Sequence, residues 1–133
     1  MKLEFLDDIS DGGKYPQVVT GGLIRLYEFD KFQAKNLKEK IAKTIIENKK
    51  PLKLAKIDFI ETVNCNLSLC LGETDIGITI IDRFNFNCEL TESSYLKMID
   101  LLEPFCVENI DGYQWLYETD GSIDFLFSPG GTW

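Results

Sequence analysis

The sequence predicts an α+β fold, in which a mainly antiparallel meander sheet of six or seven strands carries two helices packed on one face. Alternation of apolar and polar residues marks the strands, most clearly over 63–71 and 84–90. Helical spacing of apolar residues marks the two helices. The chain has 133 residues, 44% of them hydrophobic, which is enough to bury one core, so we expect a single α+β domain over 1–133.

The first part of the chain reads as two short strands followed by a helix. Residues 2–6 and 23–29 alternate well enough for strands, and the segment between them is rich in turn residues. Asp30 is suited to cap a helix, because its carboxylate can accept a backbone N–H of the first turn. The helix is therefore expected from Asp30 to Asn48. Its apolar stripe comprises Ala34, Leu37, Ile41, Ala42 and Ile45.

The middle of the chain carries the strongest β pattern, over 57–71, and we expect it to bend near Asn64. A turn at 72–75 leads into a strand at 76–82, and a further strand follows at 84–90. Short turns between consecutive strands are typical of an antiparallel meander. The alternation predicts a polar outer face and these inward side chains: Cys65, Leu67, Leu69, Phe86 and Cys88.

The last part of the chain reads as a second helix and a hairpin. The helix is expected from Glu92 to Glu103, because Pro104 lacks a backbone N–H and should end it. Large apolar residues then alternate over 113–117 and 123–127, joined by an Asp-Gly turn. Together these segments predict a helix packed beside the first one and a closing β-hairpin.

Charge is strongly segregated along the chain. Nine of the fourteen basic residues, all lysines, lie between Lys31 and Lys56 with only two acids, while the remainder is acidic and the net charge is −8. A nucleic-acid interface favours arginine and a basic domain, so no nucleic-acid partner is expected at a pI of about 4.5. The basic window is interpreted as a solvated helix face that partly neutralises the acidic body. An acidic partner and self-association are the alternatives.

The sequence excludes several kinds of active site. The chain has no histidine, so it cannot form a Ser-His-Asp triad, a Cys-His pair or a histidine-containing zinc site. Asp7, Asp8 and Asp11 lack the order of a calcium loop. The four cysteines form no Cys-x-x-Cys pair, so we expect reduced thiols. No catalytic residue, cofactor or metal is assigned.

The start of the chain favours a cytoplasmic protein. Glu4, Asp7 and Asp8 interrupt the stretch in which a signal peptide needs apolar residues. No segment reaches the roughly 18 apolar residues of a membrane span, so a membrane partner is not expected.

The candidate contact residues for a protein partner are polar or aromatic. One group is the polar face of the central strands, and a second is the set of acids around the last hairpin. The C-terminal tryptophan is a third candidate, because a Pro-Gly-Gly-Thr-Trp end frays unless its ring packs on the domain or on a partner. The candidates are Asn64, Asn66, Ser68, Asn85, Asn87, Glu89, Glu118, Asp120, Asp124 and Trp133.

This small, acidic chain, which lacks a catalytic motif, resembles the single-domain immunity proteins of bacterial polymorphic toxin systems. The resemblance covers the whole chain in general character and assigns no functional residue. It implies a cytoplasmic protein that binds and blocks a toxin domain. Many such toxins are basic nucleases, for which an acidic surface would raise the association rate.

Two other classes of function remain open at this point. A small enzyme or ligand-binding domain could use a pocket lined by Tyr113, Trp115 and carboxylates near the C-terminal hairpin. A structural or housekeeping domain could instead pair its basic helix with an acidic surface. The residues do not distinguish these classes, nor do they give the partner or the oligomeric state.

Overall fold

The computed structural model describes residues 1–6, 22–118 and 123–133. It confirms the α+β class. The elements follow in the order β1 (Lys2–Leu6), β2 (Leu23–Tyr27), α1 (Lys31–Ile41), the π-helix η1 (Ala42–Glu47), β3 (Leu52–Lys53), the 3-10 helix η2 (Leu54–Lys56), β4 (Glu61–Thr62), β5 (Asn66–Leu71), β6 (Gly77–Asp82), β7 (Asn85–Leu90), α2 (Glu92–Val107), β8 (Gln114–Tyr117) and β9 (Asp124–Phe127).

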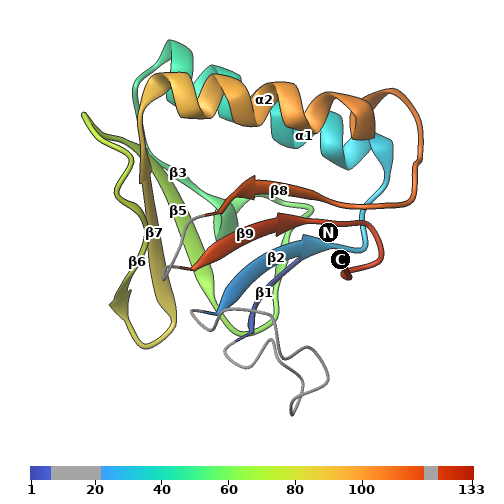
Figure 1. Cartoon of the computed structure of the whole chain (residues 1–133), viewed down its shortest axis with the longest axis horizontal. Helices are drawn as coiled ribbons and strands as arrows, with labels where there is room; N and C mark the ends of the chain where they lie inside the picture. Colours follow the sequence, from blue (N-terminus) through green and yellow to red (C-terminus); the bar gives the residue numbers. More distant parts are fainter. Residues whose placement is uncertain (7–21, 119–122) are drawn as a thin grey trace.

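The strands form two mixed sheets instead of the single meander that the sequence suggested. One sheet has the order β4-β1-β2-β9-β8 and the other has the order β3-β5-β7-β6. An isolated bridge between Ile78 and Ile123 links them. Figure 1 shows the two helices side by side along one side of the molecule, with the four-stranded sheet standing at one end and the five-stranded sheet beneath the helices.

The meander fails because β7 lies between β5 and β6. Strands β5 and β7 are parallel, with Asn66 opposite Asn85 and Leu71 opposite Leu90, whereas β6 runs antiparallel to β7 at the edge. Alternation fixes which side chains share a face, but the same pattern suits a parallel or an antiparallel neighbour. Strand β6 keeps two exposed isoleucines, Ile80 and Ile81, which suits an edge strand rather than a central one.

The long strand predicted over 57–71 is also interrupted. Leu54, Ile57 and Ile60 are all buried and recur every third residue, which is the spacing of a 3-10 turn. The backbone bonds agree with this spacing, since Ile57 N donates to Leu54 O and Ile60 N donates to Ile57 O. Only β4 and β5 remain as strands in this segment.

The first helix has the predicted extent. Asp30 accepts a hydrogen bond from Gln33 N at 2.9 Å, and the Gln33 side chain accepts one from Asp30 N at 3.3 Å, which completes a capping box. The helix then widens from α1 into the π-helix η1 and reaches its C-cap at Asn48. Ala34 and Leu37 face the core, as predicted.

The second helix runs past its predicted end. It continues to Val107, so Pro104 lies inside α2. The proline removes one backbone donor, but the turn that follows buries Phe105, whose ring meets that of Phe127 edge-on at 5.1 Å. Burial of this ring favours the last turn of the helix. None of the helices in the described ranges is long and apolar enough to cross a membrane.

The last two strands pair as a hairpin, and β9 also joins β2. Gln114 lies opposite Phe127 in the antiparallel pair β8–β9, with an irregularity after Trp115. Strand β9 runs parallel to β2 on its other side. The predicted Asp120-Gly121 turn lies outside the described residues.

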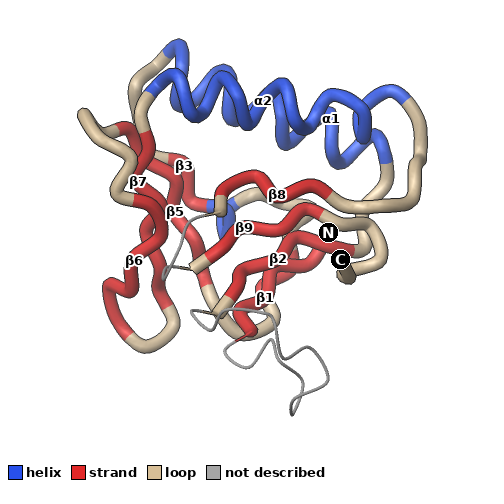
Figure 2. The backbone as a smooth tube through the Cα atoms, viewed as in Figure 1, coloured by secondary structure: helices blue, strands red, loops and turns tan. Residues whose placement is uncertain are grey.

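The core lies between the helices and the inner faces of the two sheets. The five side chains predicted to point inward are all buried: Cys65, Leu67, Leu69, Phe86 and Cys88. Figure 2 shows the β6–β7 hairpin reaching away from the helices at the end of the molecule. Among the described residues, the edge of β6 has no strand partner beyond Ile78, which bridges Ile123.

Candidate docking face and neighbouring cavities

The outer sheet face, which we define by Asn66, Ser68, Cys70, Asn85, Asn87 and Glu89, is a continuous polar surface. The parallel register sets Ser68 beside Asn87 and Cys70 beside Glu89, and all six residues are partly exposed. The helices and the five-stranded sheet lie on the opposite side (Figure 1). The structure thus brings together five of the candidates that the sequence suggested, and Glu89 is the one acid among them.

Hydrogen bonds orient the amides of this face. Asn85 Nδ2 donates to Asp82 Oδ1 at 2.9 Å. Asn87 Nδ2 lies 3.2 Å from the Sγ of Cys70 on the neighbouring strand. Because their side chains are already held in place, these amides lose little conformational entropy when a partner covers them.

The hairpin edge patch, which we define by Ile80, Ile81 and Phe84, lies at the tip of the β6–β7 hairpin, next to Asn85 of the outer sheet face. Ile80 lies opposite the buried Phe86, so its side chain is on the other face of the sheet. The three side chains of the patch are 62%, 64% and 56% exposed, respectively. The guanidinium of Arg83 lies 5.2 Å from the centre of the Phe84 ring. Apolar side chains that gather at an exposed sheet edge with polar neighbours are typical of protein-binding sites.

Asn64 has a structural role instead of a place on this face. Its Oδ1 accepts a hydrogen bond from Phe5 N, and its Nδ2 donates to Phe5 O, both at 2.8 Å. The side-chain amide therefore substitutes for a strand residue beside β1, next to the short parallel strand β4. Asn64 remains exposed while it makes these two bonds.

The C-terminal candidates lie on the five-stranded sheet, apart from the outer sheet face. Asp124 begins β9 and Glu118 follows β8, while Asp120 lies outside the described residues. Trp133 packs beside Trp115, with ring centroids 6.1 Å apart, and remains 37% exposed. The C-terminal ring therefore tucks against its own domain and keeps one side accessible.

A cavity of about 480 Å³ separates α2 from β8. Its polar lining includes Ser94, Lys97 and Glu118, and its aromatic lining is Trp115 and Tyr117. Tyr113, which the sequence suggested for such a pocket, is not part of the lining. A cavity with these walls can hold a small amphipathic molecule, with one cationic and one anionic group at hand.

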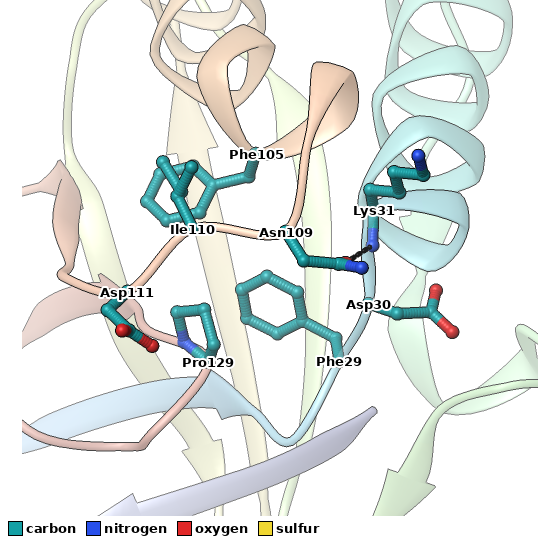
Figure 3. A pocket seen from close by; sticks show the side chains of 8 residues that line it. All are labelled: Phe29, Asp30, Lys31, Phe105, Asn109, Ile110, Asp111 and Pro129. Atoms are coloured by element: carbon teal, nitrogen blue, oxygen red, sulfur yellow. Dashed lines mark hydrogen bonds between the residues drawn. The ribbon is translucent and has the colours of Figure 1, made fainter.

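A smaller cavity of about 240 Å³ lies between the start of α1, the end of α2 and the C-terminal segment (Figure 3). Phe29, Phe105, Ile110 and Pro129 form its apolar walls. Asn109 accepts a hydrogen bond from the backbone N–H of Lys31 at 2.8 Å at its rim. This bond connects the start of α1 with the segment after α2, so the cavity lies at a joint between the two helices.

Three of the four cysteines are unsuited to nucleophilic chemistry. Burial raises the pKa of Cys65 and of Cys88 to about 12, and it raises the pKa of Cys106 as well. All four cysteines carry free thiols. A thiol with a raised pKa stays protonated near neutral pH and is a poor nucleophile or metal ligand. Among the described residues, no three Cys, Asp or Glu side chains converge into a metal site.

Five of the nine lysines of the basic window fall into two groups. Lys38 pairs with Glu103 and Lys49 pairs with Glu92, so these two lysines tie the first helix to α2. Lys40, Lys53 and Lys56 instead surround a third cavity of about 350 Å³, which we call the lysine cavity. Lysine spacing could not show this division, because the glutamates come from a helix more than forty residues away.

Comparison of the chain with protein-family models, curated proteins and solved structures finds no match. Sequence reasoning missed the hairpin edge patch, although one signal was present. The alternation of β6 breaks at the adjacent pair Ile80-Ile81, and two neighbouring apolar residues in a strand cannot both face one core.

Proposed function

We propose that this chain is a non-catalytic binding protein that docks a protein partner on the outer sheet face and the hairpin edge patch. The partner in this proposal is a basic toxin domain that the chain blocks, in the manner of immunity proteins. The observation that carries the proposal is the exposure of Ile81 and Phe84, each above one half, at the hairpin turn that borders a row of oriented amides.

The surface has the composition expected of an interface. Covering Ile81 and Phe84 would contribute on the order of 2 kcal/mol each, since this is the typical gain for burying such side chains. The amides of Asn85 and Asn87 supply donors and acceptors for a polar rim. Strand β6 also presents an edge to which an extended segment of a partner could add by backbone hydrogen bonds.

The acidic charge of the chain acts at longer range in this proposal. The net charge is −8, yet the outer sheet face holds only one acid, Glu89. The contact itself is therefore apolar and amide-rich. The net negative charge of the chain attracts a basic partner and raises the association rate. The hairpin edge patch determines the dissociation rate.

A binding experiment with matched variants tests this proposal. The test partner is the product of the gene adjacent to this one, and the affinity is measured by calorimetry. The double variant Ile81→Ala with Phe84→Ala should weaken binding by about 2 kcal/mol or more, as expected for anchor residues. The control is Phe32→Ala, because Phe32 is 65% exposed on α1, away from the sheet edge.

Two outcomes would count against the proposal. Equal binding by the double variant and the unaltered chain would show that the hairpin edge patch is not the docking site. Absence of binding to any adjacent gene product would remove the immunity-type role. Thermal unfolding of each variant, followed in parallel, separates loss of contact from loss of fold, and exposed side chains should change stability by less than about 0.5 kcal/mol.

A second candidate function is supported by the cavity between α2 and β8. Its volume of about 480 Å³ lies in the range of small-molecule sites. Filling it with Ser94→Trp would abolish ligand binding and leave partner binding by the hairpin unchanged. A small molecule that raises the melting temperature of the unaltered chain but not of Ser94→Trp would favour this function.

A further inference from the structure

We infer that the lysine cavity binds the phosphate group of a small phosphorylated molecule. The cavity has a volume of about 350 Å³ and is lined by Lys40, Thr44, Pro51, Leu52, Lys53, Lys56 and Ile57. This inference is independent of the docking surface, because the lining comes from the first helix and the segment after it, and not from the β6–β7 hairpin.

The lining groups come from four consecutive elements. Lys40 belongs to α1, Thr44 to the π-helix η1, Lys53 to β3, and Lys56 to the 3-10 helix η2. A solvated row of lysines on one helix would spread over a convex surface. Here the side chains of Lys40, Lys53 and Lys56 line a single depression, so their positive charges are concentrated around one site.

The local backbone is built to close this depression. Residues 42–47 form a π-helix, a rare geometry that often marks functional sites. Lys49 then takes a left-handed conformation with φ 55, and Lys50 N donates to the carbonyl of Thr44 at 2.9 Å. The chain thereby turns back sharply, which brings Lys53 next to the helix face that carries Lys40 and Thr44.

The charges around the cavity are not neutralised within the chain. Lys40, Lys53 and Lys56 are exposed and form no ion pair in the described part of the molecule, whereas Lys38 and Lys49 are paired with glutamates. The described lining includes no acid. In a chain of net charge −8, three unpaired lysines about one cavity make a local site for a multiply charged anion.

The chemistry of the lining favours a phosphate monoester over other anions. Lysine ammonium groups bind phosphate as point charges, whereas planar carboxylates are best matched by arginine, and the window contains none. The Thr44 hydroxyl can donate to a phosphate oxygen. Pro51, Leu52 and Ile57 give the apolar floor on which the organic part of such a molecule would lie. The acidic remainder of the chain repels a long polyanion such as a nucleic acid.

The test uses three simple probes and amide chemical shifts. Phenyl phosphate, benzoate and inorganic phosphate are titrated at low ionic strength into the ¹⁵N-labelled full chain. Phenyl phosphate should saturate, with its largest shifts at the amides of Thr44, Lys53 and Lys56. Benzoate carries the same ring with a single charge, and it should bind at least about tenfold more weakly.

Matched variants distinguish binding in the lysine cavity from non-specific attraction of the anion to surface lysines. Lys53→Gln with Lys56→Gln should raise the dissociation constant for phenyl phosphate at least about tenfold. Lys35→Gln with Lys43→Gln removes the same charge from exposed helix positions outside the cavity, and it should change that constant less than about twofold. Thr44→Val keeps the shape and should weaken binding about threefold.

Three results would overturn the inference. One is the absence of saturable binding by phenyl phosphate. A second is an equal loss of affinity for phenyl phosphate in the two double lysine variants. The third is tighter binding of a DNA oligonucleotide than of phenyl phosphate, with equal losses in both pairs, which would assign the lysines to an extended polyanion surface. Unchanged thermal unfolding of each variant confirms that a loss of binding is not a loss of fold.

Discussion

The hydroxyl of Tyr95 lies 2.8 Å from the carbonyl oxygen of Cys88, in a fully buried position. The same hydroxyl lies 2.9 Å from the carbonyl oxygen of Cys70. One side chain of α2 therefore joins the two central strands, β5 and β7, which carry the outer sheet face. The packing of the helix layer and the position of the candidate docking face are linked through this contact.

Removal of this hydroxyl should weaken the fold. Tyr95→Phe keeps the ring but removes the one proton that the carbonyls of Cys70 and Cys88 share, so the free energy of unfolding should fall by about 1–2 kcal/mol. Urea denaturation followed by circular dichroism gives this value. Tyr113→Phe is the control, because that ring is 48% exposed, and it should change stability by less than about 0.5 kcal/mol. Equal losses in the two variants would contradict the assigned role of the buried hydroxyl.

The side chain of Asn64 should matter for stability and not for partner binding. Asn64→Ala removes both bonds to the backbone of Phe5, so unfolding should become easier by about 1–2 kcal/mol. Asn36→Ala, an exposed change on α1, should leave stability unchanged or slightly higher, because alanine favours the helix. A loss of partner binding by a stably folded Asn64→Ala protein would return this residue to the docking face.

Asn64 also shows where sequence reasoning reached its limit. The alternation correctly placed Leu67, Leu69 and Phe86 inside, because the period of a strand is a local property. The role of Asn64 depends on Phe5, which is 59 residues away, and no local pattern encodes that contact. The ends of the helices show the same difference between local and long-range contacts. The cap at Asp30 was predictable from neighbours, whereas the tertiary burial of Phe105 carried α2 beyond Pro104.

The candidate site was predictable to a similar degree. The polar residues of β5 and β7 were expected on one face, and that face exists. Their neighbours were not predictable, since the central place of β7 moved β6 to the edge and exposed Ile80 and Ile81 there. Likewise, a count of lysines could show a basic window but not which lysines meet glutamates of α2.

The close approach of Gly77 to Tyr117 should make this glycine irreplaceable. Gly77 has φ +89, and a Cβ there would lie 2.8 Å from the Tyr117 ring, where the two sheets meet. Gly77→Ala should therefore lower the free energy of unfolding by more than about 2 kcal/mol, because strain and a clash add. Gly112→Ala has a similar φ of +107 but open space, and it should cost only about 1 kcal/mol. Equal costs by thermal or urea unfolding would show that no clash occurs.

The buried thiols should be protected in the native protein and should make it sensitive to alkali. Burial raises the pKa of Cys65 and Cys88 to about 12 from an ordinary 9.0, so both stay protonated in the folded chain while the unfolded chain loses protons above pH 9. The free energy of unfolding should therefore be constant with respect to these two thiols below pH 9.0 and should fall as the pH rises toward 12. Iodoacetamide should alkylate Cys65 and Cys88 only after unfolding, as followed by mass spectrometry. Rapid native modification of Cys65 or Cys88 would contradict this assignment.

The acidic body should control how fast a basic partner binds, and the hairpin edge patch should control how slowly it leaves. The acid variant replaces Glu118, Asp120 and Asp124, which are not part of the outer sheet face, by their amides. At low salt its association rate should fall about tenfold, because steering depends on the net field, and the difference should shrink as salt shortens the Debye length to about 8 Å. Removing lysines instead, by Lys35→Gln with Lys43→Gln, should leave the association rate equal or raise it.

Surface plasmon resonance with the adjacent gene product measures both rates in one experiment. Ile81→Ala with Phe84→Ala should raise the dissociation rate and leave association nearly unchanged, because apolar anchors act once contact is made. The acid variant should associate more slowly and dissociate at nearly the same rate. Its thermal unfolding should change little, so that the slower association is not a loss of fold. If the acid variant dissociates faster while associating normally, the carboxylates lie in the contact itself, and the division between steering charge and apolar anchors is wrong.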